Sequence, residues 1–237
     1  MGQHSGIGVL DKAVAVLTAA AATPVTLAEL CATTGLPRAT AHRLAVGLEA
    51  HGLLTRDAGG RWCQGPLLAV LASGAPDPLV RACAGVLPRL RDRTGESVQV
   101  YRADGLSRVC VAVAEPLSGL RDTVPLGARL PMTAGSGAQV LIAWADAGYQ
   151  RAVLAQASFT EPSLAAVRRR GWAQSVAERE PGVASVSAPV RSPAGDVIAA
   201  VSVSGPVDRI GRQPGEHWAG DLIEASASLT AALTASA

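Results

Sequence analysis

Residues 26–44 read Thr-Leu-Ala-Glu-Leu-Cys-Ala-Thr-Thr-Gly-Leu-Pro-Arg-Ala-Thr-Ala-His-Arg-Leu, and residues 52–62 read Gly-Leu-Leu-Thr-Arg-Asp-Ala-Gly-Gly-Arg-Trp. This is the order of a helix, a glycine-containing turn, a second helix and a β-hairpin. Such an order is typical of a winged helix-turn-helix, a fold that binds duplex DNA. The stretch therefore predicts a DNA-binding domain in the first part of the chain.

The two helices of this stretch carry clear start and stop signals. Thr26 is placed to be an N-cap, and Glu29 three residues later completes a capping box. Gly35 falls where the turn often needs a positive φ. Pro37 suits the first turn of the next helix, where an N–H group has no helical partner anyway. Gly52 then fits the left-handed position that follows that helix.

Apolar residues at helical spacing predict how three helices pack. The first helix covers about residues 9–21 and ends before Thr23-Pro24, because proline disfavours helix in the residue before it. The faces predicted to pack are Leu10, Val14 and Leu17 in the first helix, Leu27, Leu30 and Cys31 in the second, and Ala41, Leu44, Ala45 and Leu48 in the third.

Polar residues at the start of the third helix lie off its packed face. A recognition helix uses its N-terminal residues on base edges and phosphates, and a wing arginine can enter a minor groove or hold a phosphate. The candidate DNA-binding residues are therefore Arg38, Ala39, Thr40, His42 and Arg43 in the helix, and Arg56 and Arg61 beside the wing turn at residues 57–60. A protein-binding winged domain without a DNA role is the alternative, since residues 1–74 are only slightly basic.

Length and composition favour a two-domain cytoplasmic protein. The chain has 237 residues, of which 49% are hydrophobic but only 3% aromatic, so its core is built from Ala, Val and Leu. No apolar run approaches the roughly 18 residues of a membrane span, and the N-terminus lacks the pattern of a signal peptide. The four cysteines show no C-x-x-C spacing, so neither a zinc site nor a disulfide framework is expected. No other metal and no cofactor is expected either.

The rest of the chain reads as a linker helix followed by an α+β domain. We expect the winged helix-turn-helix at residues 1–65, a linker at 66–78 with a natural boundary at 74–78, and a second domain at 79–237. The second domain begins with a helix at 79–93 that Pro88 would kink. Extended segments at 97–102, 108–113, 124–130, 183–190 and 197–204, and helices at 138–145 and 222–233, predict an antiparallel sheet with flanking helices.

Two features of the second domain suggest a ligand pocket. The small-residue loop at 133–138 leads into a helix, whose free backbone N–H groups favour an anion such as a carboxylate. Ser202 and Ser204 point to the same face of a strand, where buried hydroxyls need partners. Ser175 and Ser185 belong to the same set. The alternative is that these hydroxyls satisfy one another across strands without any ligand.

The sequence disfavours an enzyme. It contains no G-x-S-x-G, S-x-x-K, H-E-x-x-H or Walker motif. His217 is the only histidine in the second half, within a polar and glycine-containing stretch, so any catalytic triad there has to use it.

Four motifs resemble those of the IclR family of bacterial transcription regulators. They are residues 36–44 in the recognition helix, 126–138 at the pocket loop, 178–190 with its Glu-Arg-Glu-Pro-Gly-Val start, and 202–206. Glu96-Ser97 and residues 118–125 are most similar to the actinobacterial nitrogen-dependent growth regulators of that family, which act on amino-acid metabolism, including leucine biosynthesis.

The resemblance implies a GAF-like domain that binds an effector and oligomerises, so that dimers or tetramers bind an operator under control of a small metabolite. The effector-binding residues carried over by position are Met132, Gly135, Ser136, Gly137, Ser175, Ser185, Ser202 and Ser204. Keto-acid-binding relatives often have Asp near Ser175 and Cys at Ser185. This difference disfavours a glyoxylate-like ligand and leaves an amino acid or a larger, more polar carboxylic acid.

The sequence as a whole predicts a cytoplasmic, sequence-specific DNA-binding regulator of amino-acid metabolism with a small-molecule effector. The alternative is a ligand-independent DNA-binding protein whose second domain only oligomerises. The expected partners are double-stranded operator DNA, the effector and further copies of the chain, without a membrane.

Overall fold

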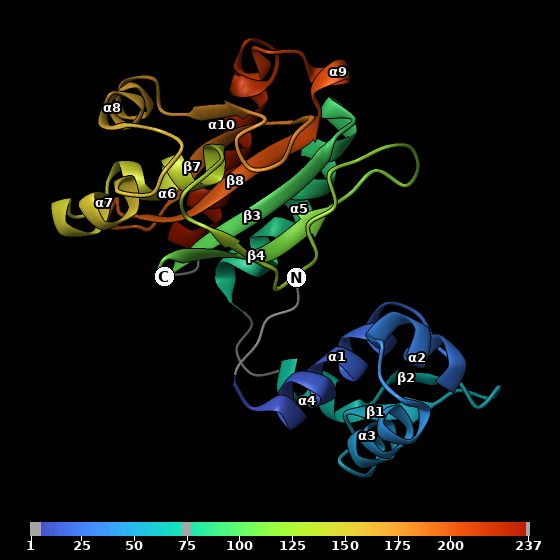
Figure 1. The fold of residues 1–237 in the computed structure, drawn as a ribbon. Coiled ribbons are helices and arrows are strands. Elements are labelled where there is room, and N and C mark those ends of the chain that lie inside the picture. Colours follow the sequence, from blue (N-terminus) through green and yellow to red (C-terminus); the bar gives the residue numbers. More distant parts are fainter. Residues whose placement is uncertain (1–5, 73–76, 236–237) are drawn as a thin grey trace. The chain divides into compact units, whose positions relative to one another are not determined.

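The structure, a computed structural model, describes residues 6–72 and 77–235. The chain divides into two compact units, Met1–Pro76 and Asp77–Ala237 (Figure 1). Each unit has its own hydrophobic core, and each is considered separately below. The predicted boundary at 74–78 falls partly on residues outside the described ranges.

The first unit is a winged helix-turn-helix, as the sequence predicts. Its elements are α1 (Gly8–Ala22), α2 (Leu27–Thr34), α3 (Arg38–Ala50), β1 (Leu54–Arg56), β2 (Trp62–Gln64) and α4 (Pro66–Ala72). Thr26 and Glu29 form the expected capping box at the start of α2. Gly35 ends α2 with φ +67°, and Gly52 follows α3 with φ +69°, both in the left-handed region.

The wing is a short antiparallel hairpin whose turn is held by one carboxylate. Leu54 pairs with Gln64 and Arg56 with Trp62. Asp57 Oδ1 accepts hydrogen bonds of 2.9 Å from the backbone N–H groups of Gly59 and Arg61. Two backbone hydrogen bonds between Val25 and Trp62, of 2.8 and 2.7 Å, then tie the wing to the segment before α2. The wing is therefore fixed to the helices rather than free at its base.

The packed face of α1 differs from the predicted one. Val16 and Ala20 are buried in the core of this unit, whereas Leu10 and Val14 are 47% and 50% exposed. Helix α1 carries Ala, Val or Leu on every side, so spacing alone does not select the face that packs on α2 and α3. Small side chains such as that of Ala20 let α1 approach its neighbouring helices closely. The prediction that Leu10 and Val14 pack inside this unit was therefore wrong, because both side chains are about half exposed in the single chain.

The second unit is built on one six-stranded antiparallel sheet in the order β5-β4-β3-β8-β7-β6. The strands are β3 (Ser97–Asp104), β4 (Ser107–Ala114), β5 (Arg129–Pro131), β6 (Ala173–Val176), β7 (Val183–Arg191) and β8 (Val197–Pro206). The helices are α5 (Pro78–Thr94), α6 (Ser136–Ala143), α7 (Ala147–Leu154), α8 (Glu161–Arg170), α9 (Val207–Ile210) and α10 (Pro214–Thr234).

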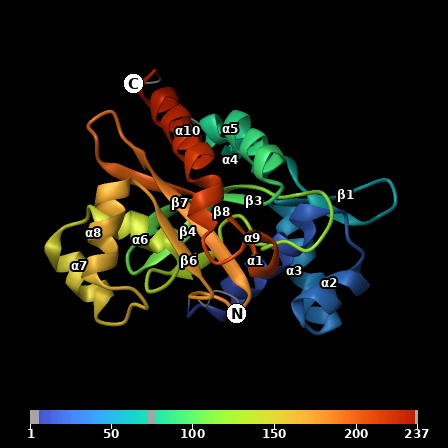
Figure 2. The same ribbon diagram turned by 90° about the horizontal axis from the view of Figure 1, so that it is seen from above.

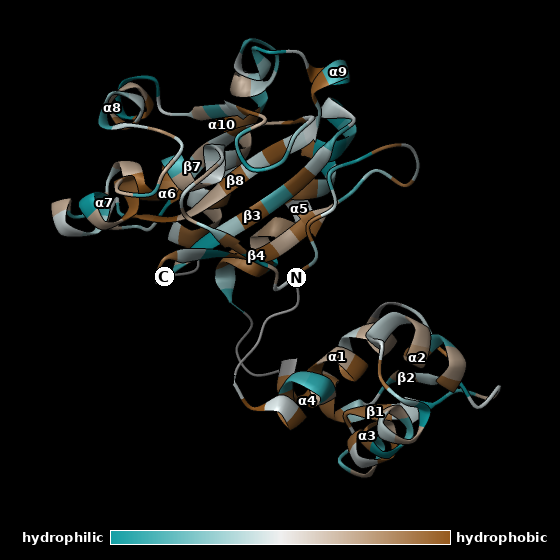
Figure 3. Cartoon of the chain, viewed as in Figure 1, coloured by the Kyte–Doolittle hydropathy of each residue, from teal (hydrophilic) through white to brown (hydrophobic). Residues whose placement is uncertain are grey.

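Helices cover both faces of this sheet. Helices α5 and α10 lie side by side on one face, and α6, α7 and α8 gather on the other (Figures 1 and 2). Polar and apolar residues alternate along β3 (Figure 3), because successive side chains point to opposite faces. Val98 and Val100 pack in the core under α5 and α10, while Tyr101 packs in the core under α6. The polar residues between the valines face the α6 side.

Several elements of the second unit differ from the sequence prediction. The segment 124–130 is mostly not a strand, since only β5 pairs there with β4. Helix α6 begins at Ser136, two residues earlier than expected, and α10 begins at Pro214. Helices α7, α8 and α9 and strand β6 were not predicted. Helix α5 continues through Pro88 from Pro78 to Thr94. No helix among the described residues is long and apolar enough to cross a membrane.

Candidate functional site

Helix α3 presents its N-terminal polar residues to solvent. Arg38, Ala39, His42 and Arg43 are exposed and Thr40 is half-buried, while Ala41 is fully buried on the opposite side. Within the described part of the chain, Arg38 and Arg43 form no hydrogen bond or ion pair. Two guanidinium groups at the start of a recognition helix are therefore available for phosphates or base edges.

The two wing arginines have partners within the unit. The Arg56 guanidinium lies 4.0 Å from the Trp62 ring centroid and 3.5 Å from Glu49. Arg61 pairs with Asp57 at 2.8–2.9 Å. A backbone hydrogen bond from Arg61 is the largest of the interactions that lower the pKa of the Asp57 carboxyl. A phosphate must compete with these partners, so the wing is a weaker source of positive charge than α3.

The predicted serines come together on the α6 side of the second sheet, in two rows that run across the strands. One row pairs Ser97 with Ser204, Ser204 with Ser185, and Ser185 with Ser175. The neighbouring row pairs Gln99 with Ser202 and Ser202 with Ser187. Residues 97, 99, 202 and 204 share a face because they alternate with buried valines. The sheet therefore carries a polar band in an otherwise apolar layer.

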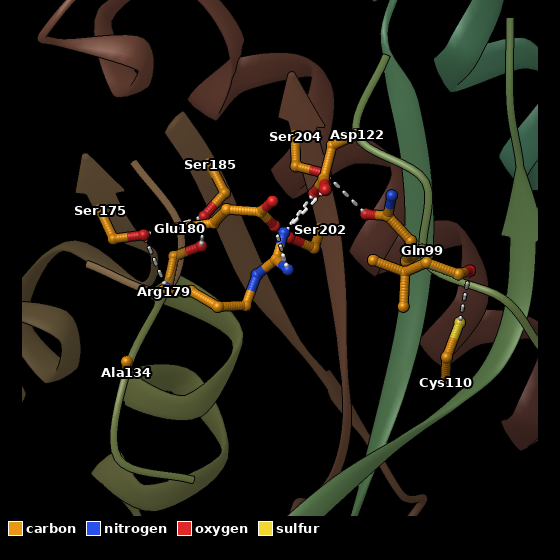
Figure 4. A network of polar contacts seen from close by, with 12 residues as sticks. Gln99, Cys110, Asp122, Ala134, Ser175, Arg179, Glu180, Ser185, Ser202 and Ser204 are labelled. Carbon is orange, nitrogen blue, oxygen red and sulfur yellow. Dashed lines mark hydrogen bonds and ion pairs between the residues drawn. The ribbon is translucent and has the colours of Figure 1, made fainter. Parts of the chain in front are cut away.

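Most of these hydroxyls have partners within the band, although Ser97 Oγ is buried without one among the described residues. Ser202 accepts a hydrogen bond of 2.9 Å from Ser187. Ser175 Oγ and Ser185 Oγ, whose residues are labelled in Figure 4, are 2.9 Å apart. Ser136 Oγ, from the start of α6, lies 2.7 Å from Ser185 Oγ and 2.8 Å from Ser187 Oγ. Ser175, Ser185 and Ser202 therefore do not need a ligand to complete their hydrogen bonds, and for them the structure contains the alternative of cross-strand pairing.

The start of α6 already holds an anion supplied by the chain itself. Gly135 N–H donates to Glu178 Oε2 at 2.9 Å, and Gln139 Nε2 and Ser158 Oγ donate to the same carboxylate at 3.2 Å. Ser136 N–H donates to Ser175 Oγ at 3.1 Å. The predicted carboxylate position at these amides is thus occupied by Glu178 and Ser175. The physical basis of the prediction holds, since an anion does sit at the helix start.

A charged pair closes the outer side of the serine band. Arg179 donates two hydrogen bonds of 2.7 Å to Asp122, one to each carboxylate oxygen (Figure 4). Arg179 lies between β6 and β7, whereas Asp122 lies in the long connection between β4 and β5. Burial alone lowers the pKa of Arg179, but the Asp122 carboxylate outweighs it and leaves that pKa above its ordinary value. The pair joins two connections that are distant in sequence.

Arg108 is a second, deeply buried cation at this place. It is 3% exposed and donates to the backbone carbonyls of Pro131 and Ala134. Its Nε is buried without a hydrogen-bond partner among the described residues. Burial is the main cause that lowers its pKa, to about 10, and repulsion from Arg179 lowers it further. An incompletely satisfied guanidinium therefore lines the pocket.

The pocket between these groups is small. Its lining residues are Tyr101, Arg108, Asp122, Gly135, Ser175, Arg179, Val183, Ser185, Ser202 and Ser204. The free cavity is about 20 Å³, which is room for about one water molecule. A metabolite can enter only if a side chain of the lining moves.

Five of the eight predicted effector-binding residues line this pocket, and three do not. Gly135, Ser175, Ser185, Ser202 and Ser204 line it. Ser136 lies fully buried beneath it, in the hydroxyl network. A Cβ on Gly137 would lie 3.3 Å from the Tyr101 ring, so this glycine lets α6 approach the sheet. Met132 is fully buried in the apolar core under α6 and makes no part of the lining.

Sequence reasoning missed the charged members of the pocket. Glu178 and Arg179 stand in the quoted motif at 178–190, and Asp122 in the stretch 118–125, but none of them was given a role. Arg108 lies on a strand that reads as apolar. A buried arginine at the inward position of an alternating strand was the available signal, because such a cation needs partners. No group of three His, Cys, Asp or Glu residues with metal-binding geometry occurs among the described residues.

Two family models cover both units. The model described as "IclR helix-turn-helix domain" matches residues 9–58, and the model described as "Bacterial transcriptional regulator IclR C-terminal" matches residues 76–231. The HTH-type transcriptional regulator BhcR of Paracoccus denitrificans is 28% identical over 95% of this chain and 87% of its own length. Such relatives are transcriptional regulators rather than enzymes, in agreement with the sequence prediction.

Solved structures match along the whole chain. A putative IclR-family regulator from Rhodococcus sp. superposes with a TM-score of 0.60 at 28% identity, covering 98% of this chain and 95% of that one. An IclR homologue from Microbacterium hydrocarbonoxydans, solved in complex with 4-hydroxybenzoate, has a TM-score of 0.71 at 23% identity and covers 96% and 99% of the two chains. At that identity the second likeness concerns the fold alone. With both units matched in order, the chain belongs to the IclR family of bacterial DNA-binding transcriptional regulators.

Proposed function

We propose that this regulator binds its operator through α3 and that a small acid, an amino acid or another carboxylic acid, enters the serine-lined pocket and changes operator affinity. The observation that carries the proposal is the occurrence of both sites in one chain. Arg38 and Arg43 are exposed and unpaired on α3 within the described residues, and the pocket in the other unit is lined by Arg108, Arg179 and four serines. The homologue complexed with 4-hydroxybenzoate gives a precedent for a carboxylate ligand.

The genes under control belong, in this proposal, to amino-acid metabolism. Support comes from the likeness of Glu96-Ser97 and residues 118–125 to the nitrogen-dependent growth regulators. Two of these residues have structural roles near the pocket. Asp122 pairs with Arg179, and Glu96 pairs with Arg209, whose Nη2 also donates to the Leu120 carbonyl. The stretch 118–125 is thus held beside the pocket by the Asp122–Arg179 ion pair and by the hydrogen bond from Arg209 to the Leu120 carbonyl.

The active form is proposed to be a homodimer or homotetramer. The exposed side of α1 supports it, since Val9 is 66% exposed and Leu10 and Val14 are about half exposed. Apolar residues gathered on one helix face are typical of an interface between protein chains. A dimer doubles the number of arginines presented to DNA, which compensates for the low net charge of a single helix-turn-helix.

Footprinting on the DNA upstream of the regulator's own gene and its neighbours, followed by titration of the protected site with and without added acids, tests the proposal. We expect one protected operator and a change in its affinity with leucine or a hydroxy acid. An affinity that stays constant with every acid supports the ligand-independent alternative. That alternative is favoured by one observation, the closed and internally satisfied serine network.

A further inference from the structure

The chain places two of its own carboxylates at separate positions here, Glu178 at the start of α6 and Asp122 on Arg179. We infer that a ligand carboxylate binds the guanidinium groups of Arg179 and Arg108 by replacing Asp122, which acts as an internal carboxylate in the ligand-free chain. The inference deepens the proposed function and rests on the same pocket. It narrows the ligand class to small carboxylates that carry hydroxyl groups.

The backbone N–H groups of Gly135 and Ser136 at the start of α6 already have partners, in Glu178 and Ser175. Gly135 N–H, Gln139 Nε2 and Ser158 Oγ all donate to Glu178. Displacing Glu178 breaks several hydrogen bonds at once and leaves a half-buried carboxylate without them. Asp122 has a simpler environment, because the hydrogen bonds to its carboxylate among the described residues both come from Arg179. A ligand carboxylate that replaces Asp122 on Arg179 therefore breaks fewer hydrogen bonds within the protein than one that replaces Glu178.

The two guanidinium groups provide more donors than the chain uses. Arg108 Nε is buried without a partner, and Arg108 and Arg179 line the same cavity. Repulsion between the two cations lowers the pKa of Arg108, after the larger effect of burial. A ligand carboxylate placed between them supplies acceptors for both, whereas the Asp122 carboxylate accepts hydrogen bonds from Arg179 alone among the described residues. Removal of Asp122 also opens the space that the closed cavity lacks.

The charge and the walls of the pocket select among carboxylates. Besides the cations, the walls are hydroxyl groups from Ser175, Ser185, Ser202 and Ser204, with Gln99 behind Ser204 (Figure 4). Gln99 Nε2 is buried without a hydrogen-bond partner among the described residues. A ligand hydroxyl can exchange hydrogen bonds with these groups. An ammonium group beside two guanidinium groups is repelled, so a hydroxy acid suits the pocket better than an amino acid.

The connection that carries Arg179 bears a conformational signature of a functional site. Ala177 has φ +56°, and it is the one residue other than glycine with a positive φ in the described part of the chain. A non-glycine residue in this region is strained unless its surroundings fix it. Ala177 directly precedes Glu178, which binds the start of α6, and Arg179, which lines the pocket, so both side chains are presented by a strained turn between β6 and β7.

Calorimetric titration of the whole protein, without DNA, tests this assignment with glycerate and its uncharged analogue glyceramide. We expect glycerate to bind and glyceramide not to bind. Asp122→Asn removes the internal competitor at nearly constant size, and glycerate should bind it roughly tenfold more tightly or better. Arg179→Gln should lose glycerate binding by a similar factor. Glu180→Gln is the matched control, because Glu180 also contacts Arg179, at 3.2 Å, but is exposed outside the pocket.

Arg179→Gln leaves the Asp122 carboxylate buried without its partner, so the double variant Asp122→Asn/Arg179→Gln serves if the single one fails to fold. Loss of glycerate binding in the double variant supports the assignment. Equal affinity for glycerate and glyceramide, no binding of glycerate by any variant, or weaker binding by Asp122→Asn each overturns it. If glycerate binds as expected while operator affinity does not respond, the proposed function fails and the anion position stands.

Discussion

The backbone N–H of Gly135 donates a 2.9 Å hydrogen bond to the Glu178 carboxylate. The helix start that most resembles an anion site is therefore filled by the protein's own side chain. The nearby Arg179–Asp122 pair repeats the arrangement with a second internal carboxylate. In the ligand-free chain, Glu178 thus accepts from the amide at the start of α6 and Asp122 accepts from Arg179. The affinity for a ligand carboxylate then depends on how readily one of these two side chains moves away.

Arg43→Ala should weaken operator binding by about 1–3 kcal/mol, the usual contribution of a charge-assisted contact to a base or phosphate. The variant should unfold at the wild-type temperature, because Arg43 is exposed and contacts none of the described residues through hydrogen bonds or ion pairs. Fluorescence anisotropy on a labelled operator measures the change. Arg151→Ala, an exposed residue of α7 with the same charge change, is the control. Equal affinity of the Arg43 variant and the wild type contradicts the recognition-helix assignment.

Asp57→Asn should strengthen operator binding and make it more salt-dependent. The amide keeps the Oδ1 acceptor for the wing turn but removes the Oδ2 partner of Arg61, which lies 2.9 Å from Arg61 Nε. A freed arginine can neutralise one more phosphate, and each adds about −0.9 to the slope of log affinity against log salt. Operator titrations at several salt concentrations measure this. Asp92→Asn, which frees Arg91 in the second unit, controls for net charge. An unchanged slope means that the wing does not contact DNA.

Ser204→Ala should cost more stability than Ser202→Ala. Ser204 is the donor to Gln99 Oε1 at 3.0 Å, and Gln99 Nε2 already lacks a partner among the described residues, so the variant leaves a buried amide unsatisfied. Such a loss costs about 1–3 kcal/mol. Ser187, the partner of Ser202, keeps its contact with Ser136 at 2.8 Å. Urea unfolding of both variants measures the difference, and an equal or reversed order contradicts the hydrogen-bond network described here.

Gly205→Ala should destabilise the second unit by about 1–3 kcal/mol, as overpacking of a buried site does. A Cβ at this position would lie 2.2 Å from Glu96 Oε2, and Glu96 is fastened by Arg209. The same substitution at Gly220 in α10 meets no atom within 4 Å and should be neutral or slightly stabilising. Thermal unfolding of the pair tests the prediction. A stable Gly205 variant would show that Glu96 can leave its position.

Local signals of the sequence were sufficient where neighbouring residues decide the structure. The capping box of Thr26 and Glu29, the left-handed Gly35 and the wing turn all depend on residues close together in the chain, and each is present. The same-face placement of Ser202 and Ser204 follows from strand geometry and also holds. The packed side of α1 was predicted wrongly, because an alanine-rich helix with apolar residues all round does not specify which side meets its neighbours.

The charged part of the pocket depends on tertiary contacts that spacing does not reveal. Asp122 and Arg179 are 57 positions apart and come from two irregular connections. Glu178 reaches Gly135 over 43 positions. Nothing in the local pattern around any of them specifies these partners, and the loop at 133–138 reads as an open anion site until Glu178 is placed against it. The sequence therefore indicated five of the residues that line the pocket but not the charged residues beside them.

Coupling between pocket and operator is the central claim, and one reciprocal measurement tests it most directly. The affinity for glycerate is measured by calorimetry on the free protein and on the protein saturated with operator DNA. Because linkage is reciprocal, glycerate must change operator affinity by the same factor by which the operator changes glycerate affinity. We expect the two affinities for glycerate to differ by roughly fivefold or more, the usual lower range for allosteric coupling. Identical affinities with and without operator would contradict an effector-responsive regulator.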